Sequence, residues 1–308
     1  MIHNKVSKLK SAYTLIELSI VILMISFLMT GSLAITISSL NKAKKISTQN
    51  KINEIYNAVG KFLLENKRLP CPASLTLTKD NSLYGIESGS GSGCSGDGIY
   101  SLDNVFYGMV PVKTLNLALN MGEDDFGSKI SYIIDQRFTT SFQNVITNKT
   151  TGFGTTASYN SVLTVNERPS EISRAITQDA ILVILSHGLN KSGAFNANSS
   201  SQNPRSSDVD ELSNDYNASF DNVFIYNSQN SQIFDDIVLF KTRNQIIQDF
   251  DAFYLIACLD SGFANQQHAY YDQNIYGNDC TGFTYKKIPE KYCDKFGNWF
   301  EINRCGSW

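Results

Sequence analysis

A run of 20 residues without a charged side chain, from Leu18 to Ile37, constrains this chain more than any other feature. As an α-helix the run is roughly 30 Å long, which matches the hydrocarbon core of a bilayer. Glu17 directly precedes the run. A carboxylate in that position is costly to bury in hydrocarbon, so it needs a partner or a specific role. The sequence therefore predicts a membrane-spanning helix with an acidic residue at its start.

A short basic leader, MIHNKVSKLKSA, precedes this helix. It ends on Ala12, and the aromatic Tyr13 and then Glu17 follow. This order resembles the processing signal of type IV prepilins and type II secretion pseudopilins. The resemblance implies that a prepilin peptidase removes residues 1–12 on the cytoplasmic side and methylates the new amine of Tyr13. The family usually has glycine where this chain has Ala12.

The resemblance also implies a role for Glu17. In filaments of the family this glutamate faces the N-terminal amine of a neighbouring subunit, and opposite charges attract strongly at low dielectric. The residues implied in subunit assembly are Glu17, Leu18, Ile20 and Val21. An ordinary signal anchor and, less favoured, a cleaved secretory signal remain alternatives. The prepilin interpretation places the leader in the cytoplasm. It places the apolar helix in the bacterial inner membrane and the rest of the chain in the periplasm.

The apolar helix is predicted to continue as an amphipathic helix. Its apolar residues recur at intervals of three and four, which is one face of a helix: Ile52, Ile55, Tyr56, Val59, Phe62 and Leu63. The sequence RLPCPA, residues 68–73, ends the helix because a residue before proline is kept out of the α region. We therefore expect five parts: leader 1–12, transmembrane or filament-core helix 13–37, amphipathic continuation 38–66, globular β-rich domain 67–245, and C-terminal extension 246–308.

The globular part is expected to be an antiparallel β-sheet domain, which makes the fold class α+β. The blocks LPCPA, MVPVKTLNLAL and DDFGSKISYII resemble a bacterial pilin-like subgroup that shares them. Residues 180–185 are apolar at every position, which predicts a central strand covered on both faces. The other predicted elements are a turn at 125–127, strands at 130–134, 161–165, 223–226 and 237–240, a long polar surface loop at 196–219, and a helix at 246–259.

The six cysteines are predicted to form disulfides, because a translocated domain meets an oxidising compartment. None forms a C-x-x-C pair, and their spacings do not suggest a zinc site. The simplest grouping pairs Cys71 with Cys94. It leaves Cys258, Cys280, Cys293 and Cys305 to pair among themselves in one of three ways. These four lie in the aromatic-rich extension, whose size of about 60 residues calls for such cross-links.

Two places could carry chemistry. Ser186 and His187 follow the buried strand, where catalytic residues can lie. The subgroup has the same SHG sequence without being known as enzymes, so we favour a structural His187 that hydrogen-bonds the adjacent loop backbone. Asp208, Asp210 and Asp215 lie in an acidic segment, and some pseudopilins hold calcium in a loop of this half of the chain. The spacing does not match an EF-hand loop, so a solvated loop without a cofactor is favoured over a calcium site.

The net charge of −3, without a long basic run, argues against nucleic acid as the main partner. The resemblance to prepilins and pseudopilins implies a non-enzymatic structural subunit. It would be a minor or tip pilin or pseudopilin, because 308 residues is large for a major subunit. Expected partners are other such subunits, the prepilin peptidase, the inner-membrane assembly platform and the lipid bilayer. The alternative is a signal-anchored periplasmic enzyme or binding protein.

Overall fold

The computed structural model describes residues 14–66, 68–90, 93–102, 104–139, 163–168, 174–216, 222–227, 234–250, 252, 291–293 and 299–301. Within these ranges, the side chains of residues 28–36, 90, 174, 291–293 and 299–301 are not described. The chain divides into two compact units, Met1–Ile46 and Ser47–Trp308.

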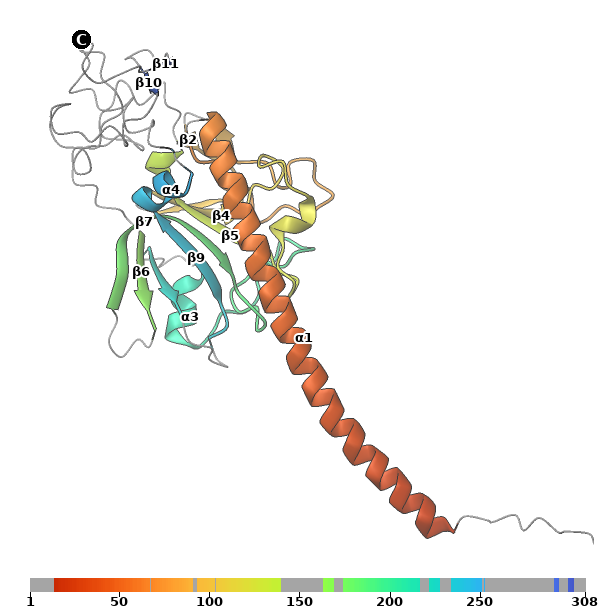
Figure 1. Cartoon of the computed structure of the whole chain (residues 1–308). Helices are drawn as coiled ribbons and strands as arrows, with labels where there is room; N and C mark the ends of the chain where they lie inside the picture. Colours follow the sequence, from red (N-terminus) through yellow and green to blue (C-terminus); the bar gives the residue numbers. More distant parts are fainter. Residues whose placement is uncertain are drawn as a thin grey trace, which may run out of the picture. The chain divides into compact units, whose positions relative to one another are not determined.

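Helix α1 (Leu15–Asn66) is 52 residues long and continues from the first unit into the second (Figure 1). The predicted apolar stripe is confirmed, since all six of its residues, from Ile52 to Leu63, are buried and belong to the hydrophobic core of the second unit. The helix ends just before the proline-containing segment, as predicted. The side chains of residues 28–36 in α1 are not described. Within the described part of the chain, no helix is long and apolar enough to cross a membrane.

The second unit is a mixed α+β structure built on a mostly antiparallel sheet, as predicted. The sheet has seven strands in the order β3-β4-β5-β7-β6-β8, with β9 also paired to β7; the β6–β8 pair is parallel. These strands are β3 (Tyr100–Leu102), β4 (Val105–Met109), β5 (Ser131–Asp135), β6 (Leu163–Glu167), β7 (Arg174–Ser186), β8 (Val223–Tyr226) and β9 (Ile237–Thr242) (Figure 1).

Strand β7 forms the centre of this sheet. Every residue from Ala180 to Ser186 is buried, and Ile184 is paired with Tyr132 of β5 and with Leu239 of β9. This confirms the prediction of a central strand covered on both faces. The strand begins six residues earlier than predicted, and its first half pairs with β6.

The short elements complete the described structure. Two of them are 3-10 helices, and two pairs of strands form small antiparallel hairpins outside the main sheet. They are β1 (Gly89–Ser90), β2 (Gly93–Cys94), η1 (Leu119–Gly122), η2 (Gln136–Phe138), α3 (Val209–Asn214), α4 (Arg243–Asp249), β10 (Lys291–Cys293) and β11 (Trp299–Glu301).

Two sequence predictions need correction here. The segment 196–219 is not simply a polar surface loop, because it contains helix α3 and buries four of its polar side chains: Asp210, Glu211, Asn214 and Asp215. The helix predicted at 246–259 begins earlier, as α4 at Arg243. Thr242 and Gln245 form a capping box that fixes this start. Most of the chain beyond Phe250 lies outside the described residues, and with it Cys258, Cys280 and Cys305.

Candidate functional site

The first unit presents an unusual apolar surface. From Leu15 to Phe27, the large apolar side chains of α1 are between 46 % and 89 % exposed: Leu15, Ile16, Leu18, Ile20, Val21, Ile22, Leu23, Met24, Ile25 and Phe27. Consecutive residues cover every side of the helix rather than one stripe. A helix that is apolar all round is found in proteins where something covers it, in a core, an assembly or a membrane. The predicted assembly residues Leu18, Ile20 and Val21 belong to this surface.

Glu17 caps the start of the same helix. Its Oε2 accepts hydrogen bonds from the backbone N–H of Thr14 at 2.8 Å and from the Thr14 hydroxyl at 3.0 Å. In return, the Glu17 N–H donates to Thr14 Oγ1 at 3.4 Å. This reciprocal pattern is a capping box, and it is an intrachain role that the resemblance did not suggest. Ala12 and Tyr13, the predicted processing residues, lie outside the described residues.

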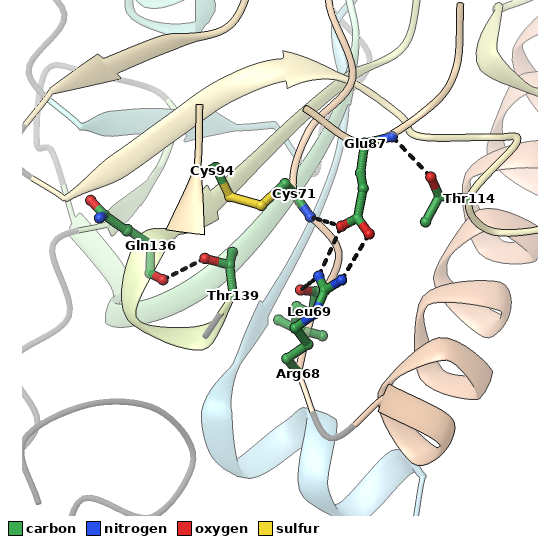
Figure 2. Close-up of a disulfide and its surroundings, with 8 residues drawn as sticks. All are labelled: Arg68, Leu69, Cys71, Glu87, Cys94, Thr114, Gln136 and Thr139. Atoms are coloured by element: carbon green, nitrogen blue, oxygen red, sulfur yellow. Dashed lines mark hydrogen bonds and ion pairs between the residues drawn. A yellow bond between two sulfur atoms is a disulfide. The ribbon is translucent and has the colours of Figure 1, made fainter. Parts of the chain in front are cut away.

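A disulfide and an adjacent ion pair lie just after the C-terminal end of α1 (Figure 2). Cys71 and Cys94 form the predicted disulfide, which lies in the second unit. Beside it, both terminal nitrogens of Arg68 donate to the carboxylate of Glu87, each at 2.8 Å, and Glu87 Oε2 also accepts from the Cys71 N–H at 2.9 Å. The disulfide and the ion pair together join residues 68–71 to residues 87–94, which include β1 and β2.

Ser186 does not form a nucleophile–base pair with its neighbour His187. Its buried hydroxyl donates to Asp124 Oδ2 at 2.7 Å. The other oxygen of Asp124 accepts from the N–H groups of Phe126 and Ser128 at 3.0 and 2.8 Å. Asp124 therefore shapes the predicted turn and ties it to the end of β7, which gives Ser186 a structural role.

His187 lies beside four acidic side chains, of which all but the half-buried Asp235 are buried. We term this group the carboxylate–histidine cluster: His187, Glu211, Asp215, Asp235 and Asp236. Nδ1 of His187 is 3.5 Å from Asp215 Oδ1 and 4.0 Å from Asp236 Oδ1. Its Nε2 is 3.4 Å from the Tyr107 hydroxyl. The partner of the imidazole is thus a tyrosine of β4, not the adjacent loop backbone that we expected.

The loop after β7 is shaped to bring the cluster together. Gly188 has φ +61°, and a Cβ there would lie 2.4 Å from the backbone oxygen of Asp235, so only glycine fits this close approach. The N–H groups of Leu189 and Asn190 then donate to Asp235 Oδ2 at 2.7 and 2.9 Å. Segments about 45 residues apart in the chain are joined in this way.

Burial disfavours the charged forms of three members of the cluster, His187, Asp215 and Asp236. It lowers the pKa of His187 to about 4 and raises the pKa of Asp215 to about 7, the latter against the opposing charge of Arg205. Burial also raises the pKa of Asp236 well above its usual range, although a hydrogen bond from Asn214 opposes the shift. The protein alone therefore stabilises several negative charges here poorly.

The three predicted metal ligands do not come together. Asp208 and Asp210 bind Arg168, at 3.0 and 2.9 Å, while Asp215 lies beside His187. Among the described residues, the acidic and histidine side chains placed to hold one ion are instead Glu211, Asp235 and Asp236, whose ligand atoms lie within 4.8 Å of one another. The available signal in the sequence was the position of Asp235 and Asp236, two adjacent carboxylates directly before strand β9.

Comparison of the whole chain with protein-family models, with curated proteins and with solved structures gives no match.

Proposed function

We propose that this chain is a non-enzymatic structural subunit, a minor or tip subunit of a type IV pilus or a type II secretion pseudopilus. The observation that carries the proposal is helix α1, which exposes large apolar side chains from Leu15 to Phe27 and then contributes a buried stripe to the second unit. In this proposal the first part of α1 is held in the inner membrane and is then transferred into a filament core.

The physical support is the cost of leaving that surface in water. Burying one large aliphatic or aromatic side chain contributes roughly 1.5–3 kcal/mol, and ten such side chains are exposed between Leu15 and Phe27. Either a bilayer or the same helix of neighbouring subunits can cover them. Ser186, whose hydroxyl is engaged by Asp124, gives no support to the alternative of a periplasmic enzyme.

The testing experiment is mass spectrometry of the N-terminal peptide from membrane-extracted protein in a host that has a prepilin peptidase. We expect a peptide that begins at methylated Tyr13. The matched variants are Ala12→Gly, which has the residue usual in the family and should be processed at least as well, and Ala12→Leu, which should block cleavage. An intact leader in both the native chain and Ala12→Gly would overturn the proposal.

A second measurement addresses assembly. Val21→Arg places a charge on the apolar surface and should remove the chain from sheared filaments, whereas Lys42→Arg, outside the apolar run, should leave incorporation unchanged. Equal incorporation of both variants would contradict a role for this surface in packing subunits together.

A further inference from the structure

The carboxylate–histidine cluster contains acceptor atoms that face one another without a donor. The Tyr107 hydroxyl donates to Ser131 Oγ at 3.0 Å, so toward Nε2 of His187, 3.4 Å away, it acts as an acceptor when that nitrogen carries the proton. A neutral imidazole protonated at Nε2 carries a bare lone pair on Nδ1. This lone pair points toward Asp215 and Asp236, at 3.5 and 4.0 Å.

These atoms are also shielded from water. His187 and Asp215 are each 1 % exposed, and within the described part of the chain neither Nδ1 nor the two Asp215 carboxylate oxygens has a hydrogen-bond partner. Arg205 Nε lies 3.5 Å from Asp215 Oδ2 but is partly exposed. Buried polar atoms without partners are costly, so this arrangement calls for a cation between them.

The remaining carboxylates are oriented as ligands by their neighbours. Asn190 Nδ2 donates to Glu211 Oε1, and Asn214 Nδ2 donates to Asp236 Oδ2 at 2.8 Å. In metal sites, a second shell of this kind holds one carboxylate oxygen and directs the other toward the ion. Asp236 is shared, because its Oδ1 faces His187 and its carboxylate belongs to the group with Glu211 and Asp235.

We propose that the carboxylate–histidine cluster binds one divalent transition-metal ion of the Mn²⁺ or Zn²⁺ class, with His187 Nδ1 and Asp236 as central ligands and further oxygen ligands from the other carboxylates. Carboxylate oxygens alone would suit Ca²⁺ or Mg²⁺, which take oxygen ligands. An imidazole nitrogen among them favours a transition metal. The ion would fasten the loop after β7, helix α3 and the start of β9 to one another.

The test uses the full-length protein in detergent, stripped with a chelator and then dialysed. We expect equilibrium dialysis to show one Mn²⁺ bound per chain, Zn²⁺ to displace it, and Mg²⁺ to displace it at least tenfold less well. Pulsed electron paramagnetic resonance of bound Mn²⁺ should show coupling to an imidazole nitrogen. Asp236→Asn should lose the ion, while Asp179→Asn, which changes an exposed carboxylate on β7, should retain it.

Three outcomes would overturn the proposal. Absence of binding would mean that the facing atoms share a proton instead. Binding of Ca²⁺ in preference to Mn²⁺, or Mn²⁺ binding without nitrogen coupling, would remove His187 from the ligands. Retention of the ion by Asp236→Asn would place it elsewhere. If Asp236→Asn does not fold, the nitrogen coupling in the native protein and its loss in His187→Gln decide the matter.

Discussion

Thr14 and Glu17 satisfy each other across the first turn of α1, with Glu17 Oε2 bound to both the N–H and the hydroxyl of Thr14. Under the proposed function the same carboxylate would pair with the amine of a neighbouring subunit. The capping bond then supplies a partner for Glu17 before assembly. To pair with the amine of a neighbouring subunit, Glu17 must either give up its hydrogen bonds to Thr14 or accept the new bond at lone pairs that these bonds do not use.

This relationship separates two roles of Glu17 by mutation. Glu17→Gln keeps an amide oxygen that can accept from the Thr14 N–H, so we expect the first turn of α1 to persist while filament incorporation is lost with the charge. Thr14→Ala should instead fray the helix start, at a cost of about 1 kcal/mol, and Thr14→Ser should behave as the native chain. Amide exchange of residues 15–18 in detergent and subunit content of sheared filaments are the two measurements. Normal incorporation of Glu17→Gln would contradict an ionic role.

Gly60 of α1 lies against the ring of Phe250. A Cβ at Gly60 would lie 2.1 Å from this ring, and Phe250 also packs on Tyr56, with ring centroids 4.9 Å apart. Alanine normally favours a helix over glycine by about 1 kcal/mol. Here we expect Gly60→Ala to lower the free energy of unfolding by about 1–3 kcal/mol because of overpacking.

The control is the double variant Gly60→Ala with Phe250→Leu, measured by urea unfolding. Removing the ring should make the alanine neutral or stabilising relative to Phe250→Leu alone. If Gly60→Ala stabilised the otherwise native chain, the close approach of α1 and Phe250 would be wrong.

The features that sequence reasoning predicted well are those with a local pattern. The extent of α1, its buried stripe from Ile52 to Leu63, and the apolar run of β7 follow from periodicity and length. The Cys71–Cys94 disulfide was the simplest pairing among six cysteines, and the structure contains it.

The features that it missed depend on partners far away in the chain. In the sequence, Glu211 and Asn214 look like solvated loop residues. In the structure, Glu211 accepts a hydrogen bond from the side chain of Asn190, and the Asn214 side chain forms hydrogen bonds with both the N–H and the carbonyl of Ile225 in β8. Only the N-cap of α3 had a local signal, Asp208 followed by acidic residues in the first turn. The burial of charge in this region follows from the tertiary arrangement, which no local pattern reports.

The Arg68–Glu87 pair should be energetically significant because both side chains are mostly buried, with 9 % and 13 % exposed. Glu87→Gln would leave Arg68 with a neutral acceptor, and Arg68→Lys cannot form two parallel bonds to one carboxylate. We expect each change to lower the free energy of unfolding by about 1–3 kcal/mol. In a double-mutant cycle measured by urea unfolding, the two changes should be less than additive. Full additivity would show that the pair does not interact.

Lys129 provides a pH-dependent test of the second unit. Its side chain is fully buried, and Nζ donates to the carbonyl oxygens of Leu75, Leu77 and Ser199 at 2.6, 2.8 and 2.9 Å. Burial lowers the pKa of Lys129 from 10.5 to about 8, against the opposing charge of Glu123. Between these two values the unfolded chain binds more protons than the folded chain. The contribution of Lys129 to the free energy of unfolding therefore rises as the pH increases through this window.

The measurement is urea unfolding of the native chain and of Lys129→Met at a series of pH values. Methionine cannot titrate, and it leaves the three carbonyl oxygens without their donor, so the variant should be less stable throughout. The informative quantity is the difference in free energy of unfolding between the two proteins. We expect this difference to be constant below pH 7 and to grow from about pH 8 to pH 10, in favour of the native chain. A difference that stays constant up to pH 10 would show that the pKa of Lys129 is not lowered by folding.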